Sequence, residues 1–296
     1  MAQRISTFFN DHLIAIVIIS TFVILFAVVL IPTIYVFVYS FFEVHISGSM
    51  RFVGLRNFAE ALSDPGFWRY LGQTLIYTFG SVALSFLIAF STALALNRIK
   101  TGRTVFRSLI LLPWLIPPAI SGLTWRWMFN DTNGLINDIL VNRLGIVSRN
   151  ILFLGTHFWA KVSIIVTDSW TRIPFMCILL LAALQGIPRD HYDAAEVDGA
   201  SAFQRLRLVT IPLIRSTIVV TLLIVTMFVL RTYEIIYLLT DGGPGDSTEV
   251  LTTHIYKNLV NYWRMGYGSA LSVLLLIIVI GVTLYYVRQL SRATER

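Results

Sequence analysis

The sequence predicts an all-α polytopic membrane protein with six transmembrane helices. Of its 296 residues, 56% are hydrophobic and only 13% are charged, which is more apolar surface than a soluble protein of this size could bury. Six segments are long enough to cross about 30 Å of hydrocarbon at roughly 20 residues per helix. These predicted spans are 13–41, 70–96, 105–128, 160–185, 213–239 and 268–288.

The apolar run 13–41 is the predicted first span. It is about twice as long as the hydrophobic region of a signal peptide, and no small-residue cleavage site follows it. We therefore interpret it as a retained transmembrane helix. Residues 42–69 then form a short polar connection to the second span.

The turn between the second and third spans is strongly basic. It contains four basic residues and no acidic one: Arg98, Lys100, Arg103 and Arg107. Because positive residues gather in short cytoplasmic loops, we expect this turn in the cytoplasm. Alternation of the spans then predicts that both termini and the segment 186–212 are cytoplasmic. This asymmetry accounts for the net charge of +7 without nucleic acid as a partner.

The third span contains Pro113, Pro117 and Pro118. Each proline removes a backbone hydrogen bond that lipid cannot replace, so we expect a kink where neighbouring helices or a polar cavity supply partners. Two interpretations stay open. The kink improves helix packing, or it is a bend that lets a pathway open.

Two predicted spans carry a close pair of opposite charges. Asp168 and Arg172 are four residues apart in the fourth span with the acid first, which is the favourable order on one helix face. Arg231 and Glu234 are three residues apart in the fifth span. A charge at mid-bilayer costs on the order of 2.5–3.5 kcal/mol on insertion scales, so both pairs require an explanation.

The charges allow a structural and a functional interpretation. In the first, each pair neutralises itself inside the helix bundle. In the second, some of these groups line a pathway and bond the hydroxyls of a polyhydroxylated substrate. Three aromatic residues in the same spans would cover its C–H surfaces: Trp170, Tyr233 and Tyr237.

The polar segment 186–212, GIPRDHYDAAEVDGASAFQRLRLVTIP, separates the fourth and fifth spans. It is interpreted as two short helices joined at Gly199, a typical C-terminal stop. Asp190 and Asp193 place negative charge near the N-terminus of the first helix, where the helix dipole favours it. An amphipathic interfacial helix is the alternative. A DNA-binding role is disfavoured because short links to two spans would hold the segment against the bilayer.

Several motifs carry a family resemblance. Asp193-Ala194-Ala195, Gly199 and Val209-Thr210-Ile211-Pro212 resemble the EAA loop of permease subunits from ATP-driven importers of the ABC type, with Asp193 where that family usually has Glu. Three further stretches are similar to the carbohydrate branch of these permeases, the maltose and glycerol-phosphate type. The similarity to that branch extends over roughly residues 20–290. The three stretches are the prolines and tryptophans of 112–137, Leu239 to Gly245 (LTDGGPG), and Thr248-Glu249.

The resemblance implies the transmembrane domain of a type I ABC importer. Its parts would be an N-terminal segment 1–69, a transmembrane core 70–290 and a cytoplasmic tail 291–296. Segment 186–212 would couple the core to an ATPase through five residues: Asp193, Ala194, Ala195, Gly199 and Pro212. The implied location is the inner membrane of a bacterium or archaeon.

The resemblance also implies the partners. They are an ABC ATPase dimer, a second homologous permease subunit, membrane lipid, a carbohydrate substrate, and a periplasmic or lipid-anchored solute-binding protein contacting loops near 130–157 and 240–266. The substrate class is a sugar, oligosaccharide or polyol. ATP and Mg would bind the ATPase, so no cofactor is expected in this chain.

Catalytic and metal-binding motifs are missing from the sequence. It contains no GxxxxGK[ST] phosphate loop, no GxSxG and no Cys/His cluster, and its five histidines are scattered. We therefore expect neither an enzyme nor a metal site. Two other classes stay open: a non-transporting scaffold, and an ion-coupled secondary transporter, which would show inverted repeats with broken helices.

Overall fold

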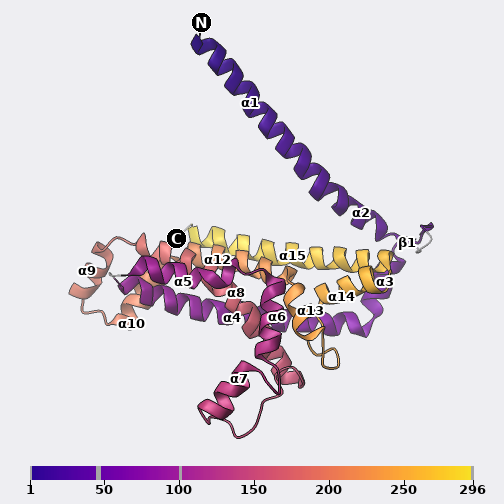
Figure 1. Cartoon of the computed structure of the whole chain (residues 1–296). Helices are drawn as coiled ribbons and strands as arrows, with labels where there is room; N and C mark the ends of the chain where they lie inside the picture. Colours follow the sequence, from indigo (N-terminus) through magenta and orange to yellow (C-terminus); the bar gives the residue numbers. More distant parts are fainter. Residues whose placement is uncertain (1, 45–47, 100–101, 295–296) are drawn as a thin grey trace. The chain divides into compact units, whose positions relative to one another are not determined.

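The computed structural model describes residues 2–44, 48–99 and 102–294 and is almost entirely helical (Figure 1). Four stretches are long and apolar enough to cross a membrane on their own: Ala15–Tyr39, Pro65–Arg98, His157–Gln185 and Met265–Arg292. Two further pairs of helices, each bent at a short break, raise the number to six if each pair is one span. The predicted fold class is confirmed.

The chain divides into two compact units. One contains Met1–Asp64 and Ile255–Leu275, and the other contains Pro65–His254 and Leu276–Arg296. Residues 255–275 therefore group with the N-terminal segment rather than with the predicted core 70–290. The first unit holds α1 (Ala2–Leu25), η1 (Phe26–Leu30) and α2 (Ile31–Tyr39), which together form the first span and expose its apolar side chains.

The connection predicted as a polar loop has its own structure. β1 (Phe42–Val44) and β2 (Met50–Phe52) pair antiparallel, and α3 (Arg56–Ser63) follows. Asn57 fixes α3 to the chain before it, because its Nδ2 donates to the carbonyl oxygens of Ser40 at 2.9 Å and Phe42 at 3.0 Å. The later part of this unit holds the end of α14 (Leu251–Tyr256), η4 (Lys257–Asn261) and the start of α15 (Met265–Thr294).

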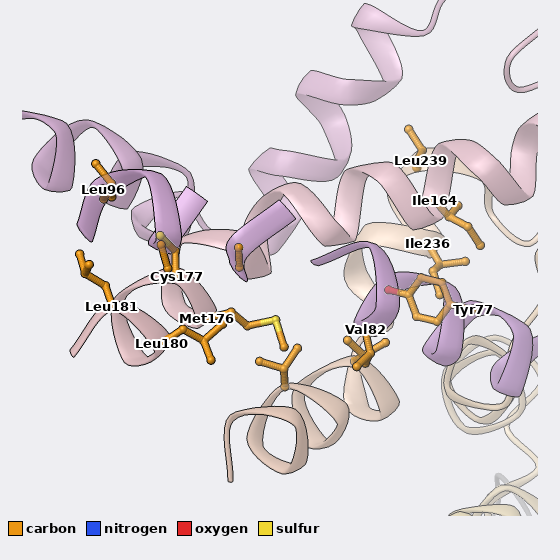
Figure 2. Close-up of a cluster of buried hydrophobic side chains, with 14 of the residues drawn as sticks. Tyr77, Val82, Leu96, Ile164, Met176, Cys177, Leu180, Leu181, Ile236 and Leu239 are labelled. Atoms are coloured by element: carbon orange, nitrogen blue, oxygen red, sulfur yellow. The ribbon is translucent and has the colours of Figure 1, made fainter. Parts of the chain in front are cut away.

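The second unit is built on α4 (Pro65–Arg98) and α8 (His157–Gln185), which pack along each other. Small residues allow the close approach: Ala89 and Ala93 are fully buried, and a Cβ at Gly80 would lie 2.7 Å from the Ile165 side chain. Around this pair the core continues with large apolar side chains, drawn in Figure 2. They include Leu96 on α4 and Met176, Leu180 and Leu181 on α8.

The third span bends at Pro117 and Pro118, where a kink was predicted, whereas Pro113 lies inside a helix. α5 (Arg103–Leu115) and α6 (Pro118–Met128) meet at 93°. The break falls at Ile116 and Pro117, both in extended conformations, because Pro118 disfavours a helical residue before it. Pro118 then opens α6, where its missing N–H costs nothing. Between α6 and α8 lie α7 (Leu135–Asn137) and η2 (Asp138–Arg143).

The prediction of a continuous fifth span over 213–239 is wrong. α12 (Arg215–Arg231) stops at Thr232, which is extended with φ −72° and ψ 126°, and α13 (Glu234–Thr240) starts after Tyr233. A second bend, of 70°, separates the helical stretch Ala202–Leu213 from α12. Hydropathy averaged over a whole span did not show either break, although the run Arg231 to Glu234 interrupts the apolar pattern at Thr232.

Candidate functional site

The segment 186–212 folds as two short helices around a glycine, as predicted. α9 (Asp190–Val197) ends in a Schellman motif, in which Ala200 N–H donates to Ala195 O at 2.9 Å and Gly199 N–H donates to Glu196 O at 3.0 Å. This geometry requires Gly199 in the left-handed region, and its φ is +74°. The glycine is therefore used for its backbone conformation.

The second helix begins with a capping box that sequence analysis missed. Ser201 Oγ accepts from Gln204 N–H at 3.3 Å, and Gln204 Oε1 accepts from Ser201 N–H at 2.8 Å. α10 (Ala202–Arg205), η3 (Leu206–Thr210) and α11 (Ile211–Leu213) then follow without interruption. The pattern S-x-x-Q after Gly199 was the available indication of this start.

Two side-chain bonds join the helices of the segment. Arg205 Nη1 donates to Glu196 Oε2 at 2.7 Å, and the Tyr192 hydroxyl lies 3.1 Å from Thr210 Oγ1. Together with the capping box, these bonds make the segment a fixed unit rather than a loose connection.

The outer surface of this unit suits a protein partner. Asp193 and Ala194 are exposed, and Ala195 is half-buried beside them. Three large apolar side chains of the segment also face outward: Val197, Phe203 and Leu208. Exposed apolar side chains next to an acidic residue are typical of a docking surface. Pro212 lies within α11, where it opens the last turn before the fifth span.

The Asp168–Arg172 pair exists and is buried. Arg172 Nη2 lies 3.0 Å from Asp168 Oδ1, and the two side chains are 13% and 0% exposed. The same Nη2 donates to Thr232 Oγ1 at 2.7 Å. Since Thr232 is the residue at which α12 ends, Arg172 connects α8 to the break in the fifth span.

Thr232 holds the break through further bonds. Its hydroxyl donates to Phe228 O at 2.9 Å, and its own carbonyl accepts from Thr252 Oγ1 at 2.8 Å. Thr232 was not among the residues predicted from the sequence. A threonine between two apolar helices gives no local indication of this role, because its partners are 20 and 60 residues away.

A row of hydroxyl groups lies beside the buried pair. The hydroxyls of Tyr77 and Ser81 on α4 lie near the Asp168 carboxylate, but neither meets a hydrogen-bond partner in the described chain. The hydroxyls of Ser85 on α4 and Thr167 on α8 are also buried without a hydrogen-bond partner in the described chain. The interface of α4 and α8 is therefore polar at the level of Asp168, inside an otherwise apolar core.

The expected Arg231–Glu234 pair is not formed. The two residues belong to different helices, and no ion pair joins them within the described ranges 2–44, 48–99 and 102–294. Arg231 lies in the last turn of α12 and Glu234 in the first turn of α13, the ends that the helix dipole favours for each charge. The Glu234 carboxylate also accepts from Tyr233 N–H at 3.4 Å.

The aromatic candidates lie on neighbouring helices. Trp170 on α8 meets Trp125 on α6 edge-on, with ring centroids 5.8 Å apart. α13, which starts after Tyr233 and carries Tyr237, packs against both α6 and α8. Gly122 allows the first of these contacts, since its Cβ position would be 3.3 Å from Ile235 O.

Arg126 is a further functional candidate that the sequence did not single out. Its Nη1 donates to Leu238 O at 3.3 Å, where α13 approaches its end, and the rest of its side chain is exposed.

In the part of the chain that the structure describes, no three His, Cys, Asp or Glu residues could share a metal ion.

Known proteins resemble this chain over most of its length. Residues 82–294 match the family described as "Binding-protein-dependent transport system inner membrane component". The trehalose/maltose transport system permease protein MalF of Thermococcus litoralis is 42% identical over 80% of this chain and 79% of its own length. The sulfoquinovosyl glycerol transport system permease protein SmoG of Agrobacterium fabrum is 34% identical over 94% and 91%.

A solved structure extends the similarity to the fold. It is a chain of the bacterial alginate ABC transporter, crystallised in complex with an alginate pentasaccharide-bound periplasmic protein. That chain superposes with a TM-score of 0.80 over 94% of this chain and 93% of its own length, at 23% sequence identity. At that identity, the comparison establishes a common fold alone.

Proposed function

This chain belongs to the family of binding-protein-dependent transport system inner membrane components, and we propose that it is the permease subunit of an ATP-driven importer of a sugar, oligosaccharide or polyol. It is a multi-pass permease of the ABC transporter type. The observation that carries the substrate class is the identity of 42% with a permease named for trehalose and maltose. The polar surroundings of Asp168 and Arg172 support it, because they supply hydrogen-bonding groups inside a membrane bundle.

The segment 186–212 is proposed to dock on the ATPase. Asp193 would meet a basic group of that partner, Ala194 and Ala195 would pack closely against it, and Gly199 would fix the turn between the two short helices. Closure of an ATPase dimer would then move this segment together with the spans on either side of it. ATP and Mg would bind the ATPase subunit, and this chain would catalyse no reaction itself.

Three further partners complete the proposal. A second, homologous permease subunit would supply the other half of the pathway. A periplasmic or lipid-anchored binding protein would deliver the sugar to loops 130–157 and 240–266. Both termini and the segment 186–212 would face the cytoplasm, as the basic turn containing Arg98 and Arg107 predicts.

The rival proposal of an ion-coupled transporter has one observation in its favour. Two spans are broken, at Pro117 and at Thr232, as that class predicts. Broken helices also fit a permease pathway, however, and the relatives of this chain are named as transport system permeases. The rival predicts transport by the lone chain under an ion gradient.

Docking on the ATPase is tested by co-purification. The chain is expressed with its neighbouring transport genes, and Asp193→Lys and Gly199→Pro are compared with wild type for bound ATPase and for stimulated ATP hydrolysis. We expect both variants to lose the ATPase or its stimulation. Ser63→Lys, which places a lysine at an exposed position of α3 outside this segment and outside the loops 130–157 and 240–266, serves as the control and should retain both. Normal coupling in Asp193→Lys and Gly199→Pro would refute the role of this segment.

The pathway role is tested by uptake of radiolabelled maltose and trehalose into vesicles. Glu234→Gln keeps the shape of the side chain and removes its charge, so assembly should survive while uptake falls. Arg288→Gln, which also removes one charge but lies near the C-terminal end of α15, outside the proposed pathway, is the control. Wild-type uptake in Glu234→Gln would remove this residue from the substrate pathway.

A further inference from the structure

The first compact unit contains a cavity that the proposed pathway does not use. Its volume is about 610 Å³, and it lies among β1, α3 and the start of α15. The polar side chains of its lining include Glu43, Arg56, Asn57, Glu60 and Arg264. Cavities that bind small molecules commonly measure roughly 300–1,000 Å³, so one or two sugar rings would fit here.

The wall of this cavity is held in place by several contacts. A Cβ at Gly266 would lie 2.0 Å from Phe42 O, so only glycine lets α15 start against the hairpin. Asn57 donates to that same carbonyl oxygen at 3.0 Å. On the α15 side, the Arg264 guanidinium lies over the ring of Tyr267, 4.2 Å from its centroid. These contacts fix the shape of the cavity before any ligand enters.

Trp263 adds an aromatic face to the lining. Its φ is +54°, a left-handed conformation that is a genuine outlier for a bulky residue. The conformation is maintained because Arg264 N–H donates to Asn258 O at 2.8 Å, which closes the turn between η4 and α15. Trp263 is 53% exposed and lines the cavity, so its ring is available to a ligand. Strain at a residue that lines a cavity is an indication of function.

The charges of the cavity select the class of ligand. Arg264 pairs with Glu60, and Arg56 lies 4.0 Å from Glu43. Two positive and two negative side chains give the lining no net charge, so neither an anion nor a cation would be favoured. Donors and acceptors stand side by side instead, which matches hydroxyl groups, since each hydroxyl both donates and accepts.

We infer that this cavity is a second saccharide-binding site, separate from the pathway around Asp168 and Arg172. A sugar ring would lie on the indole of Trp263, and the two arginine–glutamate pairs would bond its hydroxyls. The inference rests on the proposed import of a neutral sugar. In the proposed orientation, the segments that line this cavity lie on the outer side of the membrane.

The test uses the intact transporter complex in lipid discs, without nucleotide and without binding protein. Maltose and trehalose are titrated by isothermal calorimetry. The principal variant is Trp263→Gly, because glycine adopts a positive φ without strain and the variant should therefore fold. We expect Trp263→Gly to weaken sugar binding about tenfold, a change of 1.4 kcal/mol. Glu60→Gln should weaken it as well.

Two controls make the outcome decisive. Trp68→Ala removes an exposed tryptophan outside the cavity and should leave binding unchanged, whereas Trp263→Phe keeps an aromatic face and should retain most of it. The inference is overturned if the wild-type complex binds neither sugar, or if Trp263→Gly binds both as wild type does.

Failure of this inference can be told from failure of the proposed function. Uptake by the wild-type complex together with unchanged sugar binding in Trp263→Gly would remove the second site and leave the importer intact. If no ATPase co-purifies and no sugar is taken up, the proposed function itself fails.

Discussion

Two pairs of opposite charges are similar in the sequence and different in the structure. Asp168 and Arg172 form a buried ion pair on the continuous helix α8. Arg231 and Glu234 lie at the facing ends of two helices and form no pair within the described residues. The difference comes from Thr232, whose extended backbone separates the second pair. Sequence spacing therefore predicts a contact only where the helix is continuous.

The two arrangements place different demands on the bundle. Asp168 is fully buried, so its charge depends on Arg172 for compensation. Arg231 is exposed and Glu234 half-buried, and each is stabilised at a helix end. The first pair should therefore matter for stability, and the second should be free for function.

The largest expected effect is that of Arg172→Met. It leaves Asp168 as an uncompensated buried charge, which costs about 3–5 kcal/mol. Reversible unfolding of the purified chain in mixed micelles measures the change. Arg231→Met is the matched control and should cost less than about 1 kcal/mol, because the lost interaction is with a helix dipole. Equal effects of the two substitutions would contradict the comparison.

A smaller loss is expected from Thr232→Val, which keeps the shape and removes the hydroxyl. The substitution deletes an acceptor for a charged donor, and such a bond contributes about 1.5–3 kcal/mol. The same unfolding experiment applies. Thr232→Ser retains the hydroxyl and should behave like wild type. If serine and valine had the same effect, the bond from Arg172 would not be what holds the break.

The sequence predicted the local features of this chain well. Gly199, the charges at the N-terminus of α9 and the break at Pro117 all follow from neighbouring residues. The break at Thr232 could not be predicted, because Arg172 and Thr252 stabilise it from distant parts of the chain. The cavity beside Trp263 was missed for the same reason, since residues 43–60 and 263–267 meet only in the folded chain.

Removing both members of the buried pair should cost less than removing one. In Asp168→Leu with Arg172→Met, no buried charge is left, so stability should return to within about 1–2 kcal/mol of wild type. A double-mutant cycle measures the coupling between the two residues. The same cycle on Arg231 and Glu234 should give a coupling near zero. A large coupling there would mean that the two charges do meet, and the comparison would fail.

The smallest effect is expected at a third pair, which lies on the surface. Arg143 Nε donates to Asp138 Oδ2 at 2.8 Å, and Asn142 donates to the same carboxylate at 3.0 Å. Both bonds lower the pKa of Asp138 below its ordinary value, and the bond from Asn142 has the larger effect. Any stabilisation is therefore present at neutral pH and is lost as the pH falls through the lowered pKa.

Arg143→Gln should not change the unfolding midpoint at pH 7 measurably, because exposed ion pairs are screened by water and salt. Both this variant and Arg172→Met remove the arginine partner of an aspartate, one at an exposed ion pair and the other at a buried one. Comparing their unfolding midpoints therefore shows how much of the loss of stability depends on burial of the pair. If Arg143→Gln destabilised the chain as much as Arg172→Met, the presence of an ion pair would matter rather than its burial. The contrast between buried and separated charges in α8, α12 and α13 would then need another cause.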